Sequence, residues 1–264
     1  MNVFWRELQV RRKSTIIWSV SLVMLLAASM AKYSTLSSGT VDMQQIIEQF
    51  PAAIQALFGM QGLDITTVLG YYGVLVLYVS VMLSIHAGLM GADLLAREEI
   101  DKTAEFLYVK PMSRARVMWQ KLAAGAVVLL VLNGVAFVGA IVAVAEYVDL
   151  QDVIVLLVLF QVAYALLQAL WFTVGVCAAA YVQHAKYAAS VVALGVVGSY
   201  VLYVVAKMQE TSGLLHALSP FMYFDAVQVL NTESLRVGYV GAVVCTIAIG
   251  LAAAMFWQRR RDVW

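Results

Sequence analysis

Long apolar runs separated by short polar breaks set the pattern of this chain. Six runs are long enough for a helix that crosses a bilayer, because a hydrocarbon core of about 30 Å needs roughly 20 apolar residues. Strands of a membrane barrel would be shorter and would alternate apolar with polar positions, so the pattern favours helices. The predicted spans are residues 16–36, 68–90, 122–145, 153–181, 187–206 and 237–257.

Three segments outside these spans also carry apolar residues. Residues 1–14 mix apolar with basic positions, which predicts either a short helix in the membrane interface or a plain charged flank. In "DMQQIIEQFPAAIQALFG" the apolar residues recur at three- and four-residue steps, which predicts an external amphipathic helix kinked at Pro51. The partly apolar stretch 207–236 is predicted to be either a re-entrant helical hairpin or an ordinary external loop.

Composition places the chain among integral membrane proteins. Hydrophobic residues make up 63% of it and charged residues 12%, against about 25% charged in a soluble domain. With a mean hydropathy of +0.85 over 264 residues, the chain needs an apolar solvent as well as a core. Three prolines and no Ser/Gly-rich linker favour a single domain over residues 1–264. The fold class predicted is therefore all-α, with six transmembrane helices.

The distribution of basic residues predicts the orientation. With both termini in the cytoplasm, 14 of the 17 Lys and Arg residues lie on the inner side. The outer side keeps Lys32, Lys207 and Arg236, and all the charged residues in the break near residues 146–152 are acidic. This asymmetry follows the positive-inside rule.

The inner connection between the second and third spans, residues 91–121, contains the densest charge. Within it, "AREEIDKTAEFLYVKPMSRARVMWQK" holds six basic and four acidic residues. Charges four positions apart, such as Arg97 and Asp101, predict a helix with compensating surface charge, and Pro111 should end it. Next to the charged face lies the apolar "FLYV". Such a segment suits either docking into a groove of another protein or lying on its own membrane.

This connection resembles the cytoplasmic loop of the ABC-2-type exporter permeases. That family's loop runs roughly E-E-x-x-x-T-x-E-x-L, then P-x-S-R, then a Lys that opens the next span. "FPAAIQALFG" before "GYYG", "LSPFMYFDA" and the terminal "FWQRRRDVW" also sit where such permeases have similar strings, so the resemblance covers nearly the whole chain. The loop positions that match are Glu98, Glu99, Thr103, Glu105, Leu107, Pro111, Ser113, Arg114 and Lys121.

The resemblance implies a mechanism. In the family this loop is a coupling helix that fits a groove of a separate cytoplasmic ATPase, and here residues 97–109 would form it. The shorter inner connection "YVQHAKYA" would add a second contact. The residues implied in ATPase coupling are Arg97, Glu98, Glu99, Lys102, Glu105, Phe106, Leu107, Tyr108, His184 and Lys186.

The chain itself is not predicted to be an enzyme. No G-x-x-x-x-G-K-[ST] occurs, so ATP and Mg²⁺ would be bound by the partner ATPase, and no cofactor by this chain. The histidines lack metal-ligand spacing. The resemblance implies two ATPase subunits, a second permease chain in a homo- or heterodimer, membrane lipid and no nucleic acid as partners. It also implies a multi-pass protein of the cell membrane of a bacterium or archaeon.

Polar residues inside the spans are the remaining candidates. His86, Asn133, Gln161 and Gln168 lie at membrane depth, where polar groups are costly and face the bundle interior. They predict either a substrate path or, as the favoured interpretation, hydrogen bonds between helices. With no acid in mid-span, the passage suits amphipathic or lipophilic cargo such as peptides or antibiotics.

The leading hypothesis is thus the membrane subunit of an ABC exporter. Two alternatives come from other classes: a membrane scaffold or sensor that recruits a cytoplasmic partner, and a secondary transporter. The absence of an acidic residue in mid-span disfavours the secondary transporter. A neighbouring gene for a protein with Walker motifs would favour the exporter over both.

Overall fold

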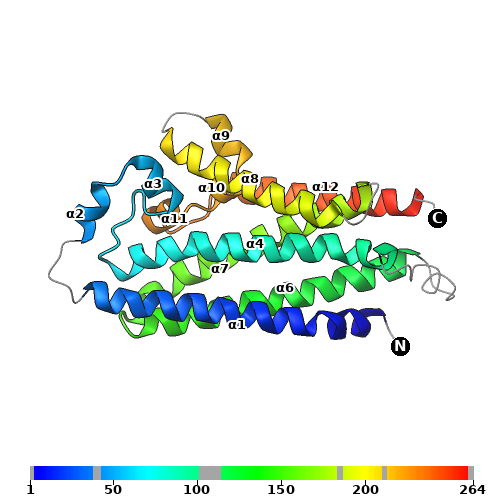
Figure 1. The fold of residues 1–264 in the computed structure, drawn as a ribbon, viewed down its shortest axis with the longest axis horizontal. Coiled ribbons are helices and arrows are strands. Elements are labelled where there is room, and N and C mark those ends of the chain that lie inside the picture. Colours follow the sequence, from blue (N-terminus) through cyan, green and yellow to red (C-terminus); the bar gives the residue numbers. More distant parts are fainter. Residues whose placement is uncertain (1–2, 38–42, 101–113, 183–186, 210–212, 261–264) are drawn as a thin grey trace.

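The computed structural model describes residues 3–37, 43–100, 114–182, 187–209 and 213–260, and in these ranges the chain is helical without any strand. Figure 1 shows long helices running side by side, with short helices gathered at one end. The predicted all-α class is confirmed. That the chain forms one domain stays a prediction.

Six helices in the described ranges are long and apolar enough to cross a membrane, which confirms the predicted number of spans. Each follows one of the predicted apolar runs. The long helices are α1 (Val3–Ser37), α4 (Val68–Ile100), α6 (Arg114–Ala145), α7 (Leu150–Tyr181), α8 (Ala188–Met208) and α12 (Val237–Arg260).

Three of these helices, α1, α4 and α6, extend at least two turns beyond the runs that predicted them. No Gly or Pro interrupts residues 3–37, and α1 is one unbroken helix. The structure therefore differs from the prediction of a separate interfacial helix over residues 1–14. At the connection predicted as residues 91–121, α4 continues to Ile100 and α6 starts at Arg114, so much of it belongs to the two long helices.

The long helices alternate in direction. The start of α1, the end of α4, the start of α6 and the end of α12 lie at the same end of the bundle, here called the termini end (Figure 1). The basic residues Arg11, Arg97 and Lys121 belong to the helix portions at that end. The arrangement agrees with the predicted charge asymmetry, although the orientation in a membrane stays a prediction.

Five short helices lie at the opposite end (Figure 1). Pro51 separates two of them, so the predicted single kinked helix is two helices that meet at the proline. In the stretch after α8, three short helices pack against α8 and α4. The five short helices of the described ranges are α2 (Met43–Glu48), α3 (Ala52–Leu57), α9 (Gly213–Leu218), α10 (Pro220–Tyr223) and α11 (Ala226–Thr232).

Helix α4 is the centre of the bundle and packs most extensively against α7. In its most apolar stretch 61% of residues are buried, against 11% in α12. The two helices approach closely at Gly88, Gly91 and Gly175. A Cβ on Gly91 would lie 2.2 Å from the carbonyl oxygen of Phe172, and one on Gly175 would lie 2.2 Å from that of Gly88. Only glycine permits backbones this close, as at other small-residue helix crossings in membranes.

Candidate functional site

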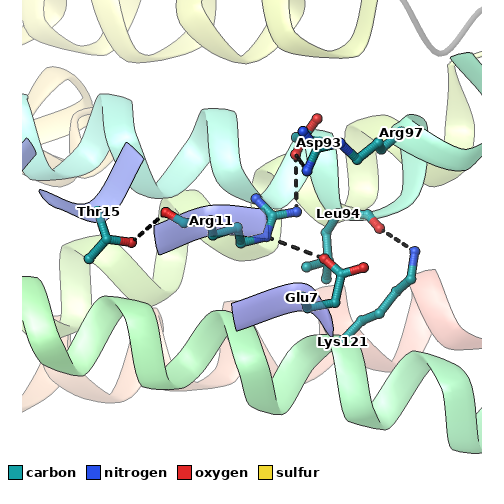
Figure 2. Close-up of polar contacts among 7 residues, drawn as sticks. All are labelled: Glu7, Arg11, Thr15, Asp93, Leu94, Arg97 and Lys121. Carbon is teal, nitrogen blue, oxygen red and sulfur yellow. Dashed lines mark hydrogen bonds and ion pairs between the residues drawn. The ribbon is translucent and has the colours of Figure 1, made fainter. Parts of the chain in front are cut away.

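A cluster of charged side chains joins α1 to α4 near the termini end (Figure 2). Arg11 of α1 lies between two carboxylates, with its Nε 3.4 Å from Oε2 of Glu7 and its Nη2 3.1 Å from Oδ2 of Asp93. Arg97, one turn further along α4, lies 3.8 Å from the same oxygen of Asp93. These four residues are called the ionic cluster below.

Two of the four charged side chains in the ionic cluster are buried. Arg11 and Glu7 are only 7% and 5% exposed, whereas Asp93 and Arg97 are about two-fifths exposed at the side chain. Removing charges from water costs several kcal/mol per ion unless they are paired, so an isolated Arg11 would not be stable here. The pairing explains how the charged start of α1 remains helical and packed against α4.

A second buried cation joins α6 to α4 beside this cluster. The ammonium of Lys121 donates a hydrogen bond of 2.7 Å to the carbonyl oxygen of Leu94, and Lys121 is 3% exposed. Figure 2 shows its side chain reaching from α6 toward the last turns of α4. Lys121 therefore holds together the two helices that flank residues 101–113.

Most of the predicted coupling residues lie outside the residues that the structure describes. Arg97 is described and belongs to the ionic cluster, while Glu98 and Glu99 are in the last turn of α4 without described side chains. Their contacts with an ATPase stay predictions. Outside the described residues lie Lys102, Glu105, Phe106, Leu107, Tyr108, His184 and Lys186.

The structure brings three of the predicted mid-span polar residues together. Asn133 of α6 donates from Nδ2 to Oε1 of Gln168 on α7 at 3.0 Å. The amide Nε2 of Gln161, also on α7, donates to both the side-chain and the main-chain oxygen of Asn133. These contacts are hydrogen bonds between helices, the interpretation that the sequence favoured. A role in a substrate path stays a prediction.

His86 lies apart from that network. Its ring packs edge-on against Trp18 of α1, with 5.2 Å between the ring centroids, and the residue is 4% exposed. Its Nδ1 atom is buried and has no hydrogen-bond partner among the described residues. His86 therefore belongs to the α1–α4 contact and not to the α6–α7 network.

Sequence reasoning missed the pairing of Arg11 with Asp93. The spacing of Glu7 and Arg11, four residues apart, was a visible signal for a helical pair. Nothing local indicated that Asp93 would be the third member, since it is far along the chain.

A second missed cluster lies at the opposite end. Lys207, near the end of α8, forms an ion pair of 2.8 Å with Oδ2 of Asp225, and the Tyr203 hydroxyl donates to Oδ1 at 3.2 Å. Asp225 directly precedes α11. Ser219 adds a bond of 2.8 Å to the carbonyl oxygen of Ser199. These contacts fasten the short helices α10 and α11 to α8.

Comparison with known proteins identifies the family. The family model of the ABC-2 family transporter proteins matches residues 1–262. No curated protein matches the chain. The match covers almost the whole chain and agrees with the six long apolar helices, so the chain belongs to the ABC-2 family of transporter proteins.

Proposed function

We propose that this chain exports an amphipathic or lipophilic molecule across the cell membrane, as one of two permease subunits driven by two ABC ATPase subunits. Family membership makes it a permease component of an ABC transporter that works with an ABC ATPase. The export direction, the cargo class, the cell membrane and the two copies of each subunit are the proposed part.

The connection between α4 and α6 is the proposed point of force input. Nucleotide-driven closure of the ATPase would move residues 97–109, and the connection between α7 and α8, through His184 and Lys186, would follow as a smaller contact. Helices α4 and α7 end, and α6 and α8 begin, at the termini end (Figure 1), where the positive-inside rule predicts the cytoplasm.

The observation that carries the proposal is the fastening of three helices around that connection. Lys121 ties α6 to the end of α4, and Arg11 ties α1 to α4 through Asp93. A displacement of the connection would therefore move α1, α4 and α6 as a unit instead of bending one helix end. Such mechanical continuity is what a permease needs in order to respond to an ATPase.

The cargo class is supported by the chemistry of the spans. In mid-span, Asn133 forms hydrogen bonds with both Gln161 and Gln168, and the charged groups described above lie toward the two ends of the helices. A passage between such helices offers few polar partners, which favours a lipophilic or amphipathic molecule over a hydrophilic ion.

Charge reversal tests the coupling. The double variant Glu98→Lys with Glu99→Lys, purified with the candidate ATPase, should bind it about tenfold or more weakly and lower its ATP turnover. The matched control reverses the exposed acids Glu146 and Asp149, which flank the α6–α7 turn at the opposite end. Unchanged complex formation and turnover in the Glu98/Glu99 variant would refute the assignment.

The cargo is tested separately, in nanodiscs that hold the permease with its ATPase. ATP turnover is measured against a panel of peptides, lipids and antibiotics. Stimulation by a subset of amphipathic compounds is expected, and a flat response across the panel would overturn the cargo class.

A further inference from the structure

The connection between α1 and α4 contains a stretch without charge. No residue between Glu48 and Asp64 is charged, and this stretch includes α3 and the turn that follows it. Asp64 is exposed and accepts hydrogen bonds from the main-chain and side-chain groups of Thr66. Four large apolar side chains of the stretch are each about two-fifths exposed, namely Phe50, Ile54, Leu57 and Phe58. A segment that faced water would leave this apolar surface uncovered.

The end of α3 lies well below the end of α8. Helix α8 has 21 residues and is therefore about 32 Å long, close to the roughly 30 Å of a hydrocarbon core. The hydroxyl of Tyr200 donates a hydrogen bond to the carbonyl oxygen of Leu57. Tyr200 precedes Met208, the last residue of α8, by about 12 Å, and side chains of a helix lean toward its N-terminus, here the far end. The end of α3 is therefore at the depth of a lipid leaflet.

Contacts with α4 place the same turn at a similar depth. The Tyr78 hydroxyl donates a hydrogen bond of 3.2 Å to the carbonyl oxygen of Phe58. Gly59, with a φ of +68°, lies so close to Leu77 that a Cβ on it would be 2.6 Å from Cδ2 and 3.4 Å from Cβ of that leucine. Leu77 lies about 14 Å from Val68, where α4 begins. Two neighbouring helices thus hold this turn below the ends of the bundle.

The hydrogen bonds of this segment suit an apolar surrounding. Non-helical backbone at membrane depth is tolerated only where its polar groups find partners in the protein. The carbonyl oxygens of Leu57 and Phe58, at the end of α3, are the ones that the two tyrosines bind. Nε2 of Gln55 donates to the carbonyl oxygens of Ile47 and Phe50 at 3.1 and 2.9 Å. Both the turn and the polar side chain of α3 therefore have partners other than water.

We propose that residues 51–59 form a re-entrant element in the leaflet opposite the termini end. Tyr78 and Tyr200 hold it there, and lipid acyl chains cover its exposed apolar side chains. At the same level α8, which is long and apolar enough to span a membrane, exposes Val197 and Val201. Both helices thus present apolar side chains outward at one depth, as a lipid-facing surface does. The inference goes beyond the proposed export function and depends on neither the cargo nor the ATPase.

Electron paramagnetic resonance of the full-length chain in phosphatidylcholine liposomes tests the proposal. Spin labels are placed on single cysteines in a Cys177→Ala, Cys245→Ala background, and their collision with oxygen and with a water-soluble nickel chelate is measured. Phe58→Cys should be open to oxygen and shielded from nickel, as should the lipid-level reference Val201→Cys. Glu48→Cys, an exposed site before the charge-free stretch, is the water reference and should be open to nickel.

Two results would overturn the proposal. If the label at Phe58→Cys meets nickel as readily as the label at Glu48→Cys, residues 51–59 lie in water. If the label at Phe58→Cys is shielded from both reagents while Val201→Cys remains open to oxygen, a protein surface such as a second copy of the chain covers the segment, and lipid does not.

Removing the two hydroxyl groups tests what holds the element in place. Tyr78→Phe with Tyr200→Phe leaves two carbonyl oxygens without their donors at membrane depth. The label at position 58 should then move toward water, with a several-fold rise in nickel collision. Tyr181→Phe removes a hydroxyl at the other end of the bundle and should leave the collision rate unchanged. If the double variant behaves like this control, the two tyrosines do not hold the element and their assignment is wrong.

Discussion

Helix α4 meets its two neighbours α7 and α1 in opposite ways. Toward α7 it presents Gly88 and Gly91, and the two backbones touch at Gly175. Toward α1 it presents His86 and Asp93, with an ion pair at one level and a groove of about 280 Å³ below it. One helix thus has a face without side chains at its closest contact and a face that depends on polar side chains.

The difference teaches that one helix of a membrane bundle can be held by backbone contact on one side and by paired charges on the other. Backbone atoms have no alternative rotamers, so the α4–α7 contact has one arrangement. Ion-paired side chains have alternative rotamers, so the α1–α4 contact depends on keeping its buried charges paired. The substitutions below test each side of this contrast.

The largest effect is expected at the glycine contact. Gly91→Leu places a side chain against the backbone oxygen of Phe172, which cannot move aside without separating α4 from α7. Overpacking of side chains against side chains typically costs 1–3 kcal/mol, so a loss of about 3 kcal/mol or more is expected here. Thermal unfolding of the purified chain in detergent measures the loss.

Gly134→Leu is the matched control, because a Cβ at Gly134 of α6 meets nothing within 4 Å. Its unfolding temperature should stay close to that of the wild-type chain. If both leucine variants lose the same stability, the close α4–α7 contact is not the cause of the loss.

An intermediate effect is expected at the ionic cluster. Asp93→Ala leaves the buried Arg11 with Glu7 alone. Breaking a fully buried pair costs about 3–5 kcal/mol and an exposed pair about 1 kcal/mol or less. Because Asp93 is 42% exposed at the side chain, the expected destabilisation lies between these limits.

A double variant distinguishes pairing from packing at the same place. On a Glu7→Gln background, Arg11→Met with Asp93→Leu should be more stable than Asp93→Leu alone, because no buried charge is then left without a partner. Chemical denaturation of the single and double variants gives the coupling between the two positions. Strictly additive losses would mean that Arg11 and Asp93 do not act as a pair.

The smallest effect on stability is expected at Lys121. Lys121→Met keeps the length of the side chain and removes both the hydrogen bond to Leu94 and the cost of burying an ammonium, so the net change should be about 1 kcal/mol or less. ATP turnover of the assembled transporter should fall further than stability does, because α6 and α4 are no longer fastened. Wild-type turnover in Lys121→Met would remove this residue from the coupling proposal.

Much of the fold could be predicted from the sequence, because the helices depend on local patterns of apolar and polar residues. The six spans follow from the lengths of the apolar runs, and α1 continues to Val3 because no Gly or Pro interrupts it. A separate interfacial helix was one of two expectations for residues 1–14, because apolar residues alternate there with charged ones such as Glu7 and Arg11. In the structure, the partner Asp93 on α4 makes their burial possible.

For the site residues too, the sequence indicated which residues matter, and the fold decided which of them make contact. Asn133, Gln161 and Gln168 stood out because polar groups at membrane depth are visible in any hydropathy pattern. Their mutual bonding depends on which faces of α6 and α7 meet. Lys121 was noticed because it matches a family motif, but its hydrogen bond to Leu94 of α4 could be found only in the structure.

By itself the sequence determined a membrane protein of six helices, the charge asymmetry between its two sides and the family to which it belongs. These properties depend on composition and on spacing between near neighbours. The tertiary structure decided that Gly91 and Gly175 form the closest contact, that Arg11 finds Asp93, and that a groove remains between α1 and α4. Such pairings join residues far apart in the chain, and they are selected by how whole helix faces fit together.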